Sequence, residues 1–140
     1  MDMSTQIRTG RHCVFNLHAH LVFVAKYRKN IFSAKIIEKL KTMFSKVCKD
    51  MEVTLKEVNG ERDHIHLLVE YQPKLALSVL VNSLKGVSSR KLKEYFPELK
   101  EFYIGKALWS PSYFAASCGG VPLEIVKRYI EQQKQPVSPP

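Results

Sequence analysis

Two histidines separated by a single residue, His64 and His66, are the first candidates for chemistry in this sequence. They lie in the run HIHLLVEY, whose β-branched and apolar residues predict a strand. Alternate residues of a strand face the same side, so both imidazoles project together, with their Cα atoms roughly 6.5 Å apart. Imidazole nitrogens bind transition metals, and open coordination positions leave room for a substrate oxygen. The alternative is a pair of polar residues on the solvent side of a half-buried strand.

His18 and His20 satisfy the same geometric test in an earlier strand, so the spacing alone does not identify a site. Asp63 directly precedes His64 and offers a carboxylate that can orient an imidazole, whereas the earlier pair has no acidic neighbour in its strand. We therefore favour the later pair as the metal site.

Tyr129 and Gln133 are four residues apart in the last helical pattern and therefore share one helix face. A tyrosine hydroxyl is a potential nucleophile, and the amide oxygen of Gln133 can bind the same cation that the tyrosine must approach. Gln132 is less suitable, because its direction differs from that of Tyr129 by about 60°. The alternative is that Tyr129 is a core residue that completes the apolar stripe of Ile125 and Val126.

A regular order of strands and helices must position these residues. The first half of the chain predicts a strand from Val14 to Ala25, a basic turn from Lys26 to Lys29, and a helix capped by Ser33 that runs through Cys48. A hairpin should follow, with strands from Met51 to Val58 and from His64 to Tyr71 and a turn at Asn59-Gly60. The second half predicts a helix after Pro73 that ends at Phe96-Pro97, a short helix and loop from Pro97 to Gly105, a strand from Ser112 to Ser117, and a helix from Pro122 to Lys134. This order predicts an α+β fold: a ferredoxin-like or RRM-like antiparallel four-stranded sheet with packed helices and a C-terminal helix that carries Tyr129.

The bulk composition indicates one domain and a polyanionic partner. The 140 residues suit a single domain over 1–134, and we expect the Pro-rich tail, 135–140, to be disordered. The net charge of +9 favours partners such as nucleic acid. We expect no membrane span and no secretory signal, because no apolar run is long enough for either. The three scattered cysteines suggest neither disulfides nor a metal knuckle, which agrees with a reducing cytoplasm.

Other catalytic classes lack their signatures in the sequence. Neither a phosphate-binding glycine loop nor a G-x-S-x-G nucleophile elbow occurs. The three aspartates of the whole chain are too few and too scattered for a carboxylate-clustered two-metal nuclease. The histidines and Tyr129 therefore remain the best candidates.

Four segments, taken in order, resemble the TnpA-type single-tyrosine HUH transposases of bacterial insertion sequences, and the resemblance covers roughly Phe15 to Gln133. HLVFVAKYRK resembles the family's opening strand, and ERDHIHLLVE carries the HUH motif of two histidines around a hydrophobic residue, here Ile65. LKGVSSRKL resembles the family's basic helix, and LWSPSYFAASCGGVPLEIVKRYIEQQ resembles its closing strand, hinge and tyrosine helix.

The resemblance implies a divalent ion, Mg²⁺ or Mn²⁺, held by His64, His66 and Gln133, with Tyr129 as nucleophile. Tyr129 would displace a 3′-hydroxyl and form a 5′-phosphotyrosine, which preserves the phosphodiester energy for rejoining without ATP. The implied substrate is single-stranded DNA with hairpins at the element ends, in a bacterial or archaeal cytoplasm. A homodimer with composite active sites is also implied, and Gly119-Gly120 with Pro122 matches its flexible connection. The residues do not identify a general base.

Basic and aromatic residues supply candidate DNA contacts. Phosphate contacts are expected from Lys26, Arg28, Lys29, Lys85, Arg90, Lys91 and Lys93, and base stacking from Tyr27, Tyr113 or Phe114. His18 and His20 are expected to be structural or, at most, DNA-facing. Two alternatives remain open: a domesticated relative that processes repetitive palindromes, and a non-catalytic nucleic-acid-binding module on a ferredoxin-like sheet.

Overall fold

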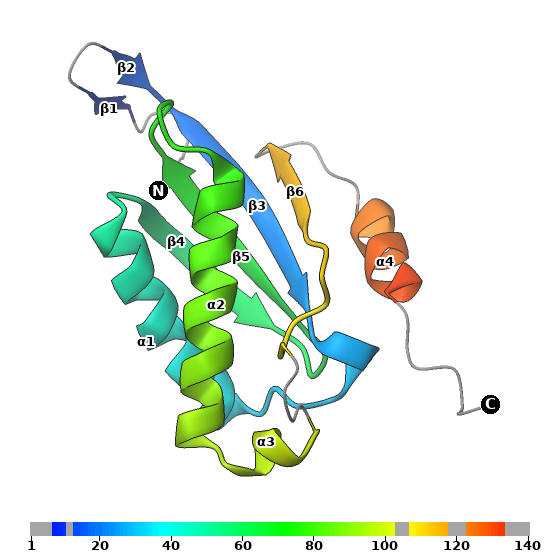
Figure 1. Ribbon diagram of the computed structural model, residues 1–140. Coiled ribbons are helices and arrows are strands. Elements are labelled where there is room, and N and C mark those ends of the chain that lie inside the picture. The colour runs from blue at the N-terminus through cyan, green and yellow to red at the C-terminus, as the bar shows by residue number, and fades with distance from the viewer. Residues whose placement is uncertain (1–6, 11–12, 103–106, 118–122, 134–140) are drawn as a thin grey trace.

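The computed structural model describes residues 7–10, 13–102, 107–117 and 123–133. Its centre is a four-stranded antiparallel sheet in the order β4-β5-β3-β6. The strands are β3 (Leu17–Val24), β4 (Thr54–Gly60), β5 (His64–Tyr71) and β6 (Phe114–Ser117). Two long helices, α1 (Ala34–Asp50) and α2 (Leu77–Tyr95), cover one face of this sheet, as Figure 1 shows. The short helix α3 (Glu98–Phe102) follows α2, and α4 (Leu123–Gln132) carries Tyr129. The predicted ferredoxin-like α+β fold is confirmed.

The main core lies between the sheet and the two long helices. Ser33 is the N-cap of α1, where its hydroxyl accepts a hydrogen bond from the Ile36 amide at 3.3 Å, as the capping pattern predicted. Leu40 and Phe44 of α1 are fully buried in this core, as is Leu84 of α2. Burial of these apolar stripes is what holds the helices on the sheet.

Alternation along the strands gives the sheet a second, more polar face. Leu21 and Phe23 of β3 belong to the main core, whereas Val22 and Val24 belong to a separate small cluster. The register pairs Val22 with His66 and Val24 with the other histidine of the motif, His64. Successive residues of a strand face opposite sides, so the two histidines lie on the face away from α1 and α2.

The predicted turn at Asn59-Gly60 is wrong. Both residues are the end of β4, where Asn59 pairs with His66 and Gly60 pairs with Ile65. A Cβ on Gly60 would lie 2.5 Å from Cδ1 of Ile65, so a larger residue here would make the end of that side chain move. The hairpin instead closes over residues 61–63, and a bulge between Leu55 and Glu57 shifts the register before it.

Other predicted boundaries differ by a few residues. The expected strand from Val14 to Ala25 divides in two, because β2 (Val14–Phe15) pairs with β1 (Arg8–Thr9) in a separate small sheet. The basic turn is a 3-10 helix, Lys26–Arg28, and β4 begins after a turn in which Glu52 has φ 58°. Strand β6 begins at Phe114, which leaves Ser112 in the preceding segment.

Several predictions lie outside the described residues. They are the glycine hinge at Gly119-Gly120, the helix start at Pro122 and the tail over 135–140. Within the described ranges, no helix is long and apolar enough to cross a membrane.

Candidate active site

The two motif histidines are held at one end of β5, close to the hairpin loop. Their rings lie at 4.8 Å between centroids, in an edge-on arrangement. Asp63 Oδ1 accepts a hydrogen bond from Nδ1 of His64 at 2.7 Å, so the contact expected from the sequence is present. Because the carboxylate holds the proton on Nδ1, the Nε2 lone pair of a neutral His64 is free to bind a cation.

His20 is a neighbour of His66 that the sequence interpretation missed. Strand β3 lies beside β5, and His20 Nε2 lies 3.1 Å from His66 Nδ1 while the two rings stack at 5.2 Å. When His66 donates from Nδ1 to His20, the Nε2 atom of His66 is also free for a cation. Each motif histidine therefore has a neighbour that can hold its Nδ1 proton.

Burial disfavours the charged forms of His66 and His20. Burial, together with the nearby His64 and His20, lowers the pKa of His66 to about 4. The pKa of His20 is also lowered by burial, and the carboxylate of Glu57 partly offsets that effect. A neutral imidazole is the form that binds metals, so the lowered pKa values suit a ligand role. Glu57 and Asn59 line a small cavity of about 270 Å³ beside His20 and His66.

Tyr129 and Gln133 meet at a serine rather than at the histidines. Ser112 Oγ lies 2.9 Å from the Tyr129 hydroxyl and donates to Gln133 Oε1 at 3.1 Å. Because a serine hydroxyl has one proton, the tyrosine is then the donor in the first of these contacts. The Gln133 amide nitrogen donates to the Tyr129 carbonyl at 3.2 Å. Burial raises the pKa of Tyr129, and the hydrogen bond with Ser112 opposes this shift.

The segment before β6 places Ser112, and its anchors lie in the main core. Trp109 stacks on Phe32 at 5.1 Å between centroids, and its indole donates to Ser88 of α2 at 2.9 Å. Lys85 Nζ donates to the carbonyl oxygens of Ser110 and Ser112 at 2.6 and 3.1 Å. The position of Ser112 therefore depends on residues far from it in the sequence.

The tyrosine helix lies on the histidine face of the sheet. Val126 and Ile130 of α4 are buried against Val22 and Val24, the register partners of His66 and His64. Tyr129 packs on Phe114 at 5.6 Å between ring centroids, so it is part of the edge of this cluster. Among the described residues, the hydrogen bonds place Tyr129 and Gln133 with Ser112, and the motif histidines with Asp63 and His20. Ile125, expected in the apolar stripe, is instead 46% exposed.

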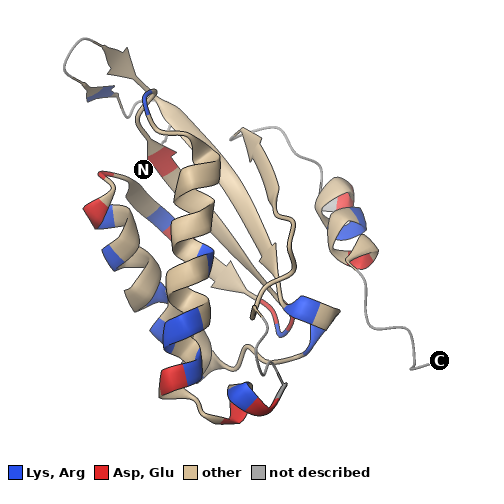
Figure 2. Ribbon diagram, in the orientation of Figure 1, with Lys and Arg blue, Asp and Glu red and all other residues tan. Residues whose placement is uncertain are grey.

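The candidate DNA-binding residues fall into two groups. Figure 2 shows basic residues toward the α3 end of α2 and on the 3-10 turn after β3. Arg28 on this turn pairs with Asp63 at 3.4 Å, which connects the turn to His64, and Tyr27 packs partly against the main core. The other candidates lie on α2 or at the turn; these are Lys26, Lys29, Lys85, Arg90 and Lys91.

The histidine that the sequence interpretation missed had a detectable signal. A ferredoxin-like order places the first and third strands of the core side by side, which brings both H-x-H pairs to adjacent strands. His18 is nonetheless apart from the site, because it is buried opposite Glu70 at the far end of the strand pair. Ser112 had no comparable signal, because a single serine in a loop is unremarkable in sequence.

The described fold is an antiparallel sheet that displays two histidines on one face, with a tyrosine-bearing helix packed on the same face. The family model for IS200-like transposases matches residues 13–133. The ISDra2 transposase TnpA of Deinococcus radiodurans is 32% identical over 130 residues, covering 91% of each chain. An IS200 transposase of Salmonella typhimurium is 32% identical over 126 residues, covering 88% of this chain and 83% of the relative.

Solved structures agree with these sequence comparisons. A candidate transposase from Deinococcus radiodurans matches with a TM-score of 0.84 at 29% identity, covering 91% of this chain and 98% of that one. A REP-associated tyrosine transposase bound to a REP hairpin has a TM-score of 0.55 at 11% identity, covering 90% of this chain and 69% of that chain, which shows a shared fold. The chain belongs to the IS200-like transposase family. It is therefore a DNA-binding enzyme of transposition that cuts and joins DNA.

Proposed function

We propose that the protein cleaves and rejoins single-stranded DNA through a covalent bond between Tyr129 and a 5′-phosphate. The observation that carries this proposal is the packing of α4 on the sheet face that displays His64 and His66. One surface of the molecule then presents both a nucleophile and a pair of metal ligands. Membership of the IS200-like transposase family supports the cutting and joining of DNA.

The residues present fit a divalent cation such as Mg²⁺ or Mn²⁺. His64 and His66 can each present a bare Nε2 while Asp63 and His20 hold the opposite ring nitrogen. Within the part of the chain that the structure describes, no three His, Cys, Asp or Glu side chains form a complete ligand set. In this proposal the third protein ligand is the amide oxygen of Gln133, which shares a helix face with Tyr129. When bound, the ion would polarise the scissile phosphate and neutralise its developing charge.

The covalent step is a transesterification at phosphorus. The Tyr129 oxygen attacks the scissile phosphate in line, a P–O bond forms to the tyrosine, and the bond to the departing 3′-oxygen breaks. The phenol gives up its proton to solvent and the departing 3′-oxygen takes one up, so the products are a phosphotyrosine and a 3′-hydroxyl. Ser112 holds the tyrosine hydroxyl in place before the proton leaves. Attack of a 3′-hydroxyl on the phosphotyrosine reverses the exchange and joins the strand, so one phosphodiester bond is conserved throughout.

We further propose that the substrate carries DNA hairpins beside the cleavage site. The REP-associated tyrosine transposase of similar fold is bound to a hairpin in its solved structure. The basic turn at Lys26–Arg28 lies next to the histidine site through the ion pair of Arg28 with Asp63, which suits a phosphate backbone near the reacting atoms. The other predicted phosphate contacts, Lys29, Lys85, Arg90 and Lys91, remain part of this proposal, as does stacking by Tyr27.

A homodimer with composite active sites completes the proposal. In the described conformation α4 packs on the sheet of its own chain through a small apolar cluster. A second copy could supply the same helix, because a C2 dimer repeats every contact. Light scattering with and without a hairpin oligonucleotide tests the dimer, and a monomer in both states would require Tyr129 to act beside the histidines of its own chain.

Trapping the covalent adduct is the decisive experiment. A hairpin oligonucleotide with a single-stranded flank, incubated with Mg²⁺ or Mn²⁺, should yield a denaturation-resistant adduct whose modified peptide contains Tyr129. Tyr129→Phe removes one oxygen but keeps the ring that packs on Phe114, so folding and DNA binding should persist while the adduct disappears. Tyr113→Phe, a half-buried tyrosine before β6, is the matched control and should leave the adduct intact.

Two outcomes would contradict this proposal. An adduct that survives in the Tyr129→Phe variant would assign the nucleophile elsewhere. Efficient cleavage by the unaltered protein in the presence of a strong chelator would remove the metal from the proposal. Duplex DNA of the same sequence should be a poor substrate, since the site must reach unpaired bases beside the scissile phosphate.

A further inference from the structure

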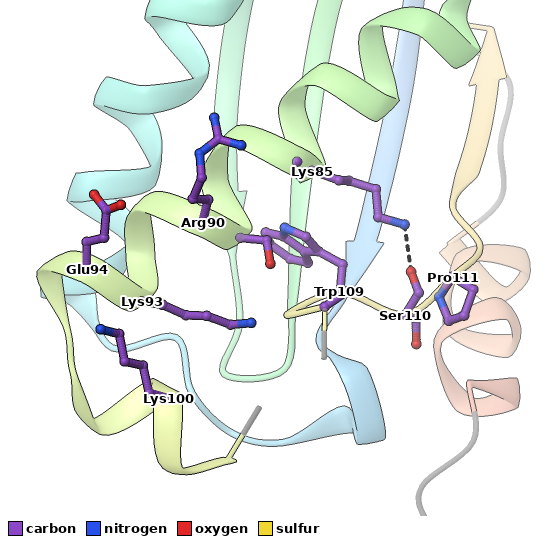
Figure 3. A pocket seen from close by; sticks show the side chains of 11 residues that line it. Lys85, Arg90, Lys93, Glu94, Lys100, Trp109, Ser110 and Pro111 are labelled. Atoms are coloured by element: carbon purple, nitrogen blue, oxygen red, sulfur yellow. Dashed lines mark hydrogen bonds between the residues drawn. The ribbon is translucent and has the colours of Figure 1, made fainter. Parts of the chain in front are cut away.

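A cavity of about 590 Å³ lies between α2, α3 and the segment over 107–111, outside the histidine site. Figure 3 shows side chains from three chain segments that surround it, with Trp109 drawn between the basic residues of α2. The lining residues used below are Lys85, Gly86, Arg90, Lys93, Lys100 and Trp109.

The lining is strongly cationic. Two lysines and one arginine come from α2, Lys100 comes from α3, and Glu94 is the single acidic residue among the lining residues. Lys85 is half-buried and donates to two backbone carbonyl oxygens, which accept its protons but do not neutralise its charge. Burial lowers the pKa of Lys85 to about 8 and also lowers that of Lys93. An anion in the cavity would offset the cost of holding the charge of Lys85 away from water.

Gly86 leaves the backbone of α2 open at the wall of this cavity. Glycine in the middle of a helix is less favourable than alanine, and packing in this chain does not require it here. A Cβ built on Gly86 meets no atom within 4 Å, and the residue lines the cavity. An open approach to the helix backbone is thus retained at the wall of a cationic cavity.

The cavity is connected to the proposed nucleophile by a short path. Lys85 Nζ contacts the carbonyl oxygens of Ser110 and Ser112, and the Ser112 hydroxyl contacts Tyr129. The segment over 110–112 therefore has the cavity on one side and the tyrosine on the other. A chain of phosphates that runs along this segment can occupy both places at once.

We propose that this cavity binds backbone phosphate of the DNA strand that leads into the active site. The inference rests on the proposed function, because it takes the substrate to be single-stranded DNA. Lys93 and Lys100 supply phosphate contacts, Gly86 allows the backbone to approach α2, and the cavity anchors the strand independently of the metal site. The contacts are to phosphate, so they do not depend on base sequence.

Binding measured without catalysis tests the cavity alone. Fluorescence anisotropy measures the affinity for labelled single-stranded oligonucleotides, in chelator and in a Tyr129→Phe background. The cavity variant carries Lys93→Ala and Lys100→Ala together. The control variant carries Lys41→Ala and Lys49→Ala on α1. The cavity variant should bind about tenfold more weakly, and the slope of log affinity against log salt should fall by between about 1 and 2. The control variant removes the same charge, and its DNA affinity should fall by less than about twofold. Lys93→Arg/Lys100→Arg should restore both affinity and slope.

The single tryptophan of the chain, Trp109, reports on occupancy because it lines this cavity. Oligonucleotide binding should change its emission in the unaltered protein and in the α1 control, but not in the cavity variant. Gly86→Ala and Gly86→Leu should fold with unchanged or higher melting temperature and should weaken DNA binding progressively. Inorganic phosphate and an RNA oligonucleotide serve as competitors, and preference for either one over DNA would overturn the DNA assignment.

The results separate this inference from the proposed function. The cavity would be refuted as a phosphate site if the cavity and control variants lost DNA affinity equally, or if Gly86→Leu left DNA affinity unchanged. Either result would hold whatever the adduct experiment shows. Loss of binding in the cavity variant with no adduct at Tyr129 would keep the cavity as a DNA site and reject the covalent mechanism.

Discussion

The two halves of the proposed active site are held in different ways. His64 and His66 lie on a strand that is hydrogen-bonded to neighbours on both sides, whereas Tyr129 lies on a helix attached by a small apolar cluster. Moving the histidines would require breaking the β3–β5 ladder, and a one-residue slip would turn both of them into the main core. The half of the proposed site that contains the two histidines is therefore held in place by the sheet.

The tyrosine half has fewer constraints. Val126 and Ile130 supply the buried contacts of α4 with the sheet, and Ser112 supplies hydrogen bonds to Tyr129 and Gln133. Breaking these contacts would leave the main core between the sheet, α1 and α2 unchanged. The comparison teaches that this fold can fix the two histidines and still release the helix that carries Tyr129, which is what the proposed composite sites in a dimer would need.

The largest expected effect comes from removing a motif histidine. His64→Ala or His66→Ala should reduce cleavage at least about 100-fold, because either change removes a proposed metal ligand. Hairpin binding, measured by anisotropy in chelator, should remain within about twofold, because phosphate contacts draw on other residues. His18→Ala is the matched control on the adjacent strand. The assignment would be reversed if His18→Ala eliminated metal dependence and His64→Ala did not.

An intermediate effect is expected from the neighbours that hold the rings. Asp63→Asn and His20→Asn should each weaken Mn²⁺ binding about 10- to 100-fold, since each residue contacts the Nδ1 atom of one motif histidine. Isothermal calorimetry with Mn²⁺ measures this without any reaction. Glu61→Gln, in the same hairpin loop, is the control for loss of a carboxylate. Unchanged Mn²⁺ affinity in both neighbour variants would show that the orienting contacts have no role in metal binding.

The smallest expected effect comes from the tyrosine half. Ser112→Ala should slow adduct formation about twofold to tenfold, because it removes the hydrogen bonds to Tyr129 and Gln133, each worth about 0.5–1.5 kcal/mol. Adduct yield over time on denaturing gels measures this rate. Ser112→Thr keeps the hydroxyl and should recover the rate, and Ser45→Ala on the exposed side of α1 should have no effect. A large fall in Mn²⁺ affinity for Ser112→Ala would contradict the separation of the two halves.

The fold was predictable from sequence because its elements are strongly patterned. The apolar periodicity of α1 and the cap at Ser33 place that helix to within a residue or two. The turn at Asn59-Gly60 failed for a tertiary reason: both residues pair with β5, at His66 and Ile65, so the strand continues past the local turn signal. Local turn propensity does not register such a contact.

The sequence by itself determined which residues are candidates for the chemistry and which of them share a face. The H-x-H spacing of His64 and His66 and the four-residue spacing of Tyr129 and Gln133 are local, because strand and helix periods depend only on the backbone. Only the tertiary structure decided that His20 lies against His66 and that Ser112 joins Tyr129 to Gln133. Those contacts depend on strand order and on how Trp109 and Lys85 anchor a distant segment. Such long-range packing is decided by the core as a whole, which no short stretch of sequence contains.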